Sequence, residues 1–168
     1  YCNSSNNLVT NNYPYCATGS ANAYNGFKSL KMYSKGSSNG IKEYSVAYLP
    51  EFSANVNTLK IRFFYKGGSS YNINKVRLAV GVSEEVTDTT TFTRLATFIP
   101  TGTDWTEYEV ELNGYTGTGN RITIMQTSTS TTGFSCYIDS LVVETVGSSN
   151  RPATFEASNI TANDATLT

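Results

Sequence analysis

Histidine is absent from this 168-residue chain, and charged residues make up only 15% of it. Without histidine, Ser-His-Asp and Cys-His catalysis are excluded, and so are zinc sites with histidine ligands. The net charge is −1, and Lys and Arg do not cluster in any run. Since binding to a phosphate backbone needs clustered positive charge, nucleic-acid binding is not expected. No apolar run reaches the roughly 20 residues that cross a bilayer, so direct membrane insertion is not expected either.

The carboxylates show no catalytic signature. A glycosidase needs two carboxylates placed about a bound sugar. The predicted loops contain Glu84, Glu85, Asp88 and Asp104 without a recognisable glycosidase pattern around them. A row of alternating acids predicts charge pairing on a solvated strand face with Lys60, Arg62 or Arg77; the row is Glu107, Glu109 and Glu111. We therefore expect a non-catalytic protein, with a glycoside hydrolase as the least favoured alternative.

The residues that are plentiful, namely Ser, Thr, Asn, Gly and 12 tyrosines, indicate an extracellular protein. Apolar and polar residues alternate with a period of two, and turn signals separate the segments. Eight strands are expected, over 29–34, 41–49, 58–66, 75–83, 92–99, 105–112, 121–127 and 133–145. No stretch combines helical periodicity with helix caps. The pattern predicts an all-β fold, an antiparallel β-sandwich of two sheets or a barrel.

The stretch 133–145 is predicted to be the closing strand, paired with an early strand of the chain. It is apolar except for Asp139 in its middle, and this carboxylate needs a hydrogen-bonding loop, a cation or a metal as its partner. Alternation also predicts the buried core. Its expected members are Leu59, Ile61, Phe63, Leu78, Val80, Val110, Leu112, Ile122, Ile138 and Val143.

Three cysteines are present, Cys2, Cys16 and Cys136. Residues 1–26 have no periodicity and are expected to form a long ordered loop or a draped arm. A Cys2–Cys16 bridge would close this polar segment and contribute about 3 kcal/mol in the chain-entropy model. Cys136 is then a free, buried thiol, although its pairing with the N-terminal segment is the main alternative. Any bridge would support an oxidising compartment.

The chain divides into a main domain over 1–147, a linker over 148–151 and a short addition over 152–168. The addition contains Pro152, Phe155 and the run SNITANDATLT. These residues resemble the first strand, turn and second strand of a fibronectin type III domain that is cut off here. The resemblance implies a neighbouring fibronectin type III domain, with the shortened piece mobile or added as strands to an exposed edge.

The main domain also has a family resemblance, carried by six stretches over 24–144. They read YNGFKSLKMYS, YLPEF, LKIRFFYKG, VRLAVGVSEEVTDTTTFTRLATF, GTDWTEYEVELNGYTG and RITIMQTSTSTTGFSCYIDSLVVE. The order and spacing resemble jelly-roll domains related to MAM, carbohydrate-binding and cleaved-adhesin modules of Bacteroidetes-type surface proteins, with a galactose-binding or concanavalin-like fold. The resemblance implies a secreted or cell-surface accessory module of a multidomain bacterial protein. Its expected partner is a glycan or a host or extracellular-matrix protein, and a structural spacer is the alternative.

A structural calcium is the cofactor that the resemblance implies. It maps onto Asp139 and the Asn25-Gly26 region, where side-chain and carbonyl oxygens would be ligands. Residues 1–30 contain no Asp or Glu, so such a site would be weak. The alternative is that Asp139 pairs with Lys28 or caps a loop.

Recognition is expected in loops, where a tyrosine ring can stack on a sugar and Asn or Asp can bond its hydroxyls. The candidate ligand-binding residues are Tyr13, Tyr15, Tyr24, Tyr71, Asn72, Asp88 and Tyr115. Trp105, at the start of a predicted strand, is expected to serve packing, with sugar stacking as its alternative.

Overall fold

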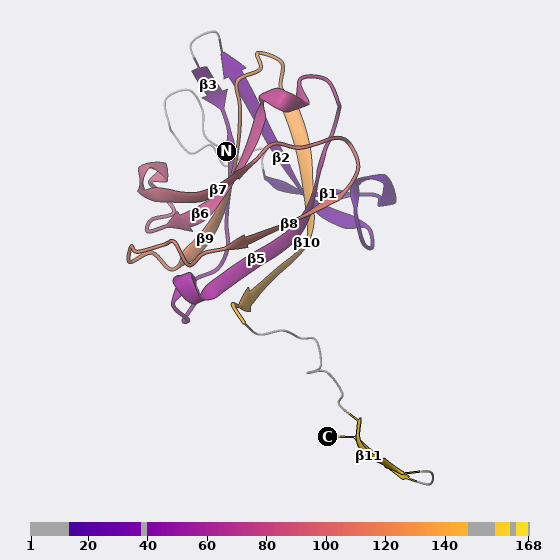
Figure 1. Cartoon of the computed structure of the whole chain (residues 1–168). Helices are drawn as coiled ribbons and strands as arrows, with labels where there is room; N and C mark the ends of the chain where they lie inside the picture. Colours follow the sequence, from indigo (N-terminus) through magenta and orange to yellow (C-terminus); the bar gives the residue numbers. More distant parts are fainter. Residues whose placement is uncertain (1–13, 38–39, 148–156, 162–163, 168) are drawn as a thin grey trace.

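The computed structural model describes residues 14–37, 40–147, 157–161 and 164–167. Two antiparallel sheets lie face to face, and the part of the chain so described contains four short 3-10 turns and no α-helix (Figure 1). The alternation of apolar and polar residues fits this arrangement, because each strand turns one face to the core and one to solvent. The predicted two-sheet antiparallel sandwich is confirmed.

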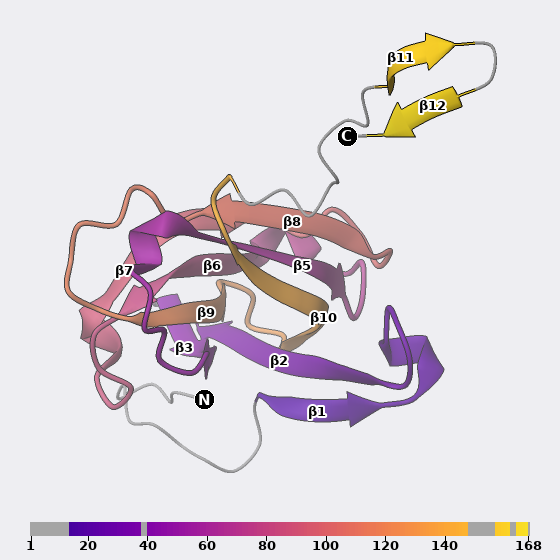
Figure 2. The same ribbon diagram turned by 90° about the horizontal axis from the view of Figure 1, so that it is seen from below.

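The first sheet has the order β1-β2-β10-β5-β8, with β3 on the far part of β2 (Figure 2). Its strands are β1 (Tyr15–Thr18), β2 (Lys28–Ser37), β3 (Gly40–Glu43), β5 (Leu59–Gly67), β8 (Thr106–Glu111) and β10 (Phe134–Thr145). The predicted closing strand is β10, which lies between the early strand β2 and β5. It seals the sheet at its centre, as expected from its apolar sequence.

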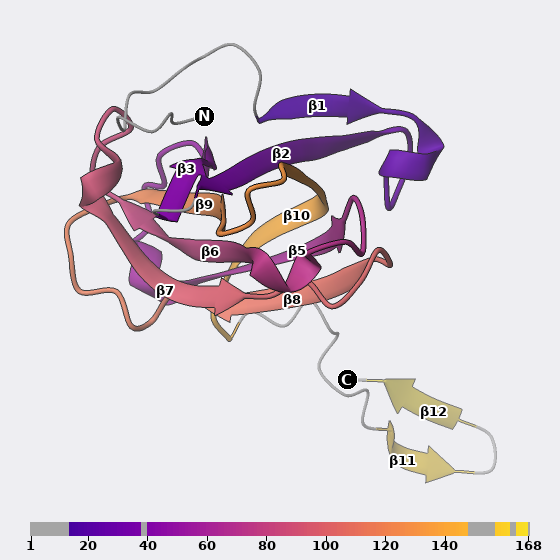
Figure 3. The same cartoon turned by 90° about the horizontal axis from the view of Figure 1, so that it is seen from above.

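The second sheet has the order β4-β9-β6-β7 and covers the other side of the core (Figure 3). Its strands are β4 (Ser45–Tyr48), β6 (Val76–Ser83), β7 (Phe92–Phe98) and β9 (Arg121–Ser128). The 3-10 turns are η1 (Ser20–Asn22), η2 (Val56–Thr58), η3 (Ile73–Lys75) and η4 (Thr89–Thr91). None of the helical turns in the described residues is long and apolar enough to cross a membrane.

The core lies between the sheets and contains the residues that alternation selects. The residues expected there are buried, including Phe63 and Val80, which are fully inaccessible to solvent. Val143 is the exception, because it is only half-buried and packs against the edge of the core. Cys136 is buried and free, as predicted.

Two predictions about strands are wrong. The stretch 41–49 is not one strand but two, because β3 pairs with β2 whereas β4 pairs with β9 in the opposite sheet. Where the chain crosses, the Ser45 Oγ accepts from the Tyr33 N–H (2.9 Å) and donates to the Tyr33 carbonyl (2.6 Å). The Ser45 side chain thus forms the hydrogen bonds with the Tyr33 backbone of β2, at a position where β3 no longer pairs with β2. The expected arm over 1–26 also contains a short strand, β1, which extends the first sheet.

The C-terminal residues form a separate two-stranded antiparallel sheet of β11 (Ala157–Thr161) and β12 (Asp164–Leu167). Two consecutive strands are what the fibronectin-like sequence predicts for this stretch. The assignment of these residues to a fibronectin type III domain stays a prediction.

Candidate functional site

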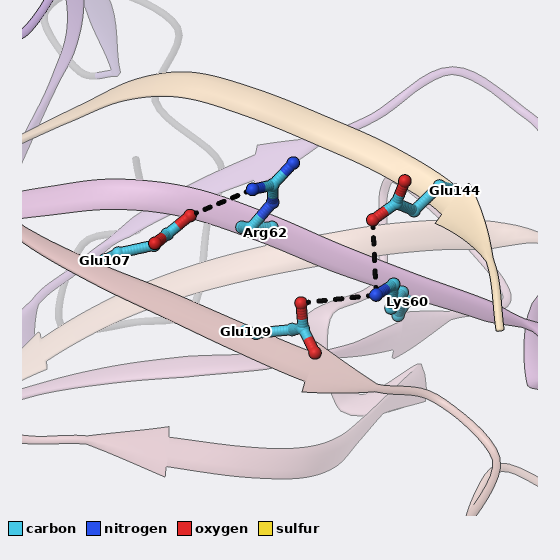
Figure 4. A network of polar contacts seen from close by, with 5 residues as sticks. All are labelled: Lys60, Arg62, Glu107, Glu109 and Glu144. Atoms are coloured by element: carbon cyan, nitrogen blue, oxygen red, sulfur yellow. Dashed lines mark hydrogen bonds and ion pairs between the residues drawn. The ribbon is translucent and has the colours of Figure 1, made fainter. Parts of the chain in front are cut away.

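The outer face of the first sheet carries two groups of side chains. At one end of β5, Lys60 lies 3.3 Å from Glu144 and 3.4 Å from Glu109, and Arg62 lies 3.2 Å from Glu107 (Figure 4). The hydrogen bond to Glu144, and then that to Glu109, raises the pKa of Lys60. Each of these carboxylates therefore has a cation beside it, which confirms the predicted charge pairing for Glu107 and Glu109 with Arg62 and Lys60.

The pairing partners follow the twist of the sheet rather than its register. Lys60 is directly opposite Glu111 and Arg62 opposite Glu109, yet each cation contacts the acid that lies two residues nearer the start of β8. Glu111 instead accepts a hydrogen bond from the Asn113 Nδ2. Arg77, the third cation considered, donates to the carbonyls of Asn74 and Val76.

Farther along the same face, rings and lysines alternate across the strands. Tyr15 on β1 is opposite Lys31 on β2, Lys31 is opposite Tyr137 on β10, and Tyr137 is opposite Lys66 on β5. Trp105 completes the series, immediately before β8. We call these five residues the ring–lysine row. Their side chains share one face because directly opposite residues in a sheet point the same way.

Each lysine of the row lies between two rings. The Lys31 Nζ is 5.6 Å from the centre of the Tyr15 ring and 5.7 Å from that of Tyr137. The Lys66 Nζ is 5.5 Å from the Tyr137 ring and 5.0 Å from the Trp105 ring. These distances are within the range of cation–π attraction, which keeps the side chains aligned. Tyr15 is 42% exposed, and the other four members are half-buried.

The segment between β1 and β2, residues 19–27, borders one side of the row. Its Tyr24 ring stacks on Phe64 of β5 with centroids 3.6 Å apart, and it meets Trp105 edge-on at 6.0 Å. The Ala21 carbonyl accepts a hydrogen bond of 2.6 Å from the Lys66 Nζ. Tyr24 remains 48% exposed. The segment therefore forms a partly aromatic wall beside the row.

A shallow hollow of about 360 Å³ borders the other side of the row. Lys31 and Tyr137 of the row line it, together with Gly68, Ser69 and Tyr71. Tyr71 is 67% exposed. We call the sheet face over the row, from Tyr24 on one side to this hollow on the other, the trough.

The predicted ligand-binding residues divide between this trough and other places. Tyr15, Tyr24 and Tyr71 border the trough, and Asn72 follows Tyr71 with a left-handed backbone (φ 59°). Asp88 does not join them. It caps η4 by accepting from the backbone N–H and the hydroxyl of Thr90, and these two bonds lower its pKa. Tyr13 lies outside the described residues.

Tyr115 is a correction, because it is a core residue and not a loop residue that contacts a ligand. Only 2% of it is exposed, and its hydroxyl accepts a hydrogen bond of 2.7 Å from the Gly119 N–H. A Cβ atom at Gly117 or Gly119 would collide with this hydroxyl. The turn after β8 thus folds around Tyr115. The polar sequence of this turn does not indicate that the tyrosine is buried.

Four residues at the trough were missed as site residues, namely Lys31, Phe64, Lys66 and Tyr137. Recognition was expected in loops, whereas these four residues lie on strands. The signal was available, since the alternation that places Phe63 and Tyr65 inward also places Phe64 and Lys66 outward. What the sequence did not provide was the strand order that brings Tyr15 and Tyr137 into one row.

Asp139 lies beside the trough, at a bulge in β10 where Ser140 has a φ of 50°. Its Oδ2 accepts from the backbone N–H groups of Tyr24 (2.7 Å) and Asn25 (3.1 Å), and its Oδ1 accepts from that of Ser140 (2.6 Å). The predicted proximity of Asp139 to the Asn25-Gly26 region is therefore observed, in the form of loop capping.

These contacts do not supply the oxygen-rich shell that calcium prefers, because N–H donors occupy the carboxylate. In the described ranges no three acidic or cysteine side chains gather into a metal-binding group. Calcium binding through Asp139, Asn25 and Gly26 stays a prediction.

Cys16 is exposed on β1, and it forms no disulfide with another described residue. Its predicted partner, Cys2, lies outside the described residues. The Cys2–Cys16 bridge therefore stays a prediction.

The architecture, a sandwich of two antiparallel sheets, is a jelly-roll fold shared by several solved structures. The K1 cleaved adhesin domain of Lys-gingipain from Porphyromonas gingivalis is 19% identical, with a TM-score of 0.58 over 79% of this chain and 83% of that one. A family 30 carbohydrate-binding module of a Clostridium thermocellum cellulosomal cellulase is 13% identical, with a TM-score of 0.53 over 86% of this chain and 90% of that one.

A family 16 carbohydrate-binding module is also similar, at 18% identity and a TM-score of 0.50 over 81% of this chain and 89% of that one. At these identities the likeness establishes the fold. No protein-family model matches the sequence, and no curated protein is similar enough to count as a relative.

Proposed function

We propose that this domain is a non-catalytic carbohydrate-binding or adhesion module, and that the trough over the ring–lysine row is its binding site. The observation that carries the proposal is the row itself. Three half-exposed or half-buried rings, Tyr15, Tyr137 and Trp105, lie on one rigid sheet face. Such rings present the apolar faces on which a sugar stacks, and their polar atoms can bond its hydroxyls.

The placement on strands supports recognition rather than a merely structural role. The core is complete without these residues, because they face away from it. A rigid platform also lowers the entropy lost when a ligand binds. The likeness in fold to carbohydrate-binding modules and adhesin domains agrees with this proposal. A host or extracellular-matrix protein is the alternative occupant of the same face.

We further propose that the domain belongs to a secreted or cell-surface multidomain bacterial protein, beside a fibronectin type III domain. The extracellular composition and the two paired strands Ala157–Thr161 and Asp164–Leu167 support this setting. Repeated weak sites along such a chain would gain affinity through multivalency.

The test is a glycan and matrix-protein array probed with the domain displayed multivalently, followed by calorimetry with any ligand found. Replacing Tyr137 or Trp105 by Ala should weaken binding about tenfold or more, because a buried aromatic contact typically contributes over about 1.4 kcal/mol. Tyr137→Phe keeps the ring and should bind almost normally. Ile99→Ala, an exposed apolar residue just after β7, is the distant control.

Equal folding of all variants must be checked by thermal unfolding. If the array finds no ligand for the multivalent domain, the spacer hypothesis replaces this proposal. If it finds a ligand whose affinity is unchanged by both alanine variants, the site is elsewhere on the molecule.

A further inference from the structure

We infer that the trough selects acidic polysaccharides, namely extended chains of β-linked sugars with a carboxylate on at least every second sugar. This inference rests on the proposed function, since it names the ligand class of the same site. It follows from three observations. These are the spacing of the rings, the position of the lysines, and the hydrogen-bond and ion-pair partners of the nearby acids.

The spacing comes from the register of the first sheet. Tyr15, Tyr137 and Trp105 lie on or next to every second strand, and a lysine occupies each strand between them. Neighbouring strands are about 4.8 Å apart, so consecutive rings are about 10 Å apart across the trough. An extended chain of β-linked pyranoses advances by roughly one strand spacing per sugar. A chain that crosses the strands would therefore place alternate sugars over rings and the others over lysines.

The lysines give the intervening positions a positive charge. Lys66 takes part in none of the ion pairs found in the described part of the chain. One of the three ammonium protons of Lys66 goes to the Ala21 carbonyl, which leaves donors for a ligand. Lys31 carries the same charge two strands away, where it lines the hollow together with Tyr71. Ammonium groups can also donate to the hydroxyls of a neutral glycan, but a carboxylate gains the added attraction of opposite charge.

Four acids on this face have partners other than Lys66. Asp139 is held by backbone N–H groups, Glu107 by Arg62, and both Glu109 and Glu144 by Lys60. The face is therefore divided into a charge-paired end and an end where positive charge lies between rings. An anionic sugar would meet attraction at the second end.

Binding would exchange one lysine partner for another. In the unbound protein each ammonium group lies against ring faces, an attraction that is weaker than a hydrogen bond to a carboxylate. The lysine stem is flexible, so the ammonium group can turn to the ligand and free a ring face for stacking. The rings of the row would thus stack on one sugar of an acidic disaccharide repeat, and the lysines would bind the carboxylate of the other sugar.

The experiment compares three acidic polysaccharides with their carboxyl-reduced neutral counterparts, namely hyaluronan, unsulfated chondroitin and β-1,4-polyglucuronate. Calorimetry with the 168-residue protein should show tighter binding to the acidic member of at least one pair. Exposed charge contacts contribute roughly two- to fivefold each, so the preference should be of about that size per lysine. This preference for the acidic polymer should decrease as the sodium chloride concentration is raised.

Matched variants assign the preference to the row. Lys66→Gln should lower the affinity for the acidic polymer about two- to fivefold more than it lowers the affinity for the neutral one. Lys66→Arg should retain the preference. Arg94→Gln removes an exposed cation from β7 of the other sheet and should change neither affinity.

The two proposals fail in different ways. If no acidic polymer is preferred, or if the preference survives the double change of Lys31 and Lys66 to Gln, the acidic class is wrong. The binding site itself is refuted only if Tyr137→Ala and Trp105→Ala leave the affinity for every bound glycan unchanged.

Discussion

The rings of Tyr24 and Phe64 are stacked, with centroids 3.6 Å apart and planes 11° apart. Phe64 is fixed in the middle of β5, whereas Tyr24 belongs to the 19–27 segment. The Tyr24 backbone N–H also donates to Asp139 on the neighbouring strand β10. Two adjacent strands thus position this segment, which is why it can form a defined wall beside the trough.

Replacing Tyr24 by Ala should lower the free energy of unfolding by about 1 kcal/mol, because a stacked aromatic pair contributes on this scale. Phe27→Ala, in the same segment, is the matched control. Phe27 is 72% exposed and should change stability by less than about 0.5 kcal/mol. Urea denaturation measures both. Equal effects of the two changes would mean that the stack does not hold the segment.

Replacing Tyr115 by Ala should cost about 3–5 kcal/mol, since it empties a large site in the core. Tyr115→Phe keeps the ring but leaves the buried Gly119 N–H without its acceptor, so it should cost about 1–3 kcal/mol. Tyr71→Ala, at an exposed position, should have almost no effect on urea denaturation. A Tyr115→Ala variant as stable as Tyr71→Ala would contradict the buried position.

The contrast between Tyr115 and Tyr71 shows what the sequence can and cannot predict. Alternation along a strand is a local property, and it correctly predicted the inward positions of Phe63 and Val80. Tyr115 follows a strand in a glycine-rich turn without alternation, so its burial depends on how residues 117–119 fold back. That fold is a tertiary property.

The candidate site depends on the tertiary arrangement of the strands even more than the burial of Tyr115 does. The strand order β1-β2-β10-β5-β8 joins residues from the first and last thirds of the domain, and no local pattern specifies it. The division of 41–49 between two sheets was hidden for a similar reason. No turn residue separates Glu43 from Ser45, and the crossing is satisfied by a side chain that bonds β2. Charge pairing was predictable because complementary charges alternate on two strands.

Cys136 should make stability depend on pH in the alkaline range. Burial raises the pKa of its thiol well above the ordinary value of 9.0, while its hydrogen bond with Tyr65 lowers it to a smaller extent. Well below pH 9.0 both states keep the proton. Above it the unfolded chain loses a proton that the folded chain retains, so stability falls as pH rises, by up to about 1.4 kcal/mol per unit.

Urea denaturation between pH 7.5 and 10, with a phosphine reductant, measures this slope. Cys136→Ala should be less stable at pH 7.5 but should show a shallower decline, because its unfolded state lacks this titration. Parallel declines in the two proteins would show that other groups cause the effect.

Asp139 should hold the 19–27 segment whether or not calcium is present. Replacing it by Ala removes the acceptor of the Tyr24, Asn25 and Ser140 N–H groups, and should cost about 1–3 kcal/mol in excess chelator. Asp139→Asn retains one acceptor oxygen and should cost less. Thermal unfolding in millimolar calcium then tests the predicted ion separately, since an ion bound to the folded state raises the melting temperature by mass action. A calcium-dependent rise in the wild type that is lost in both variants would establish the ion at Asp139. Full stability of Asp139→Ala in chelator would instead contradict the capping role, because the three hydrogen bonds would then contribute nothing.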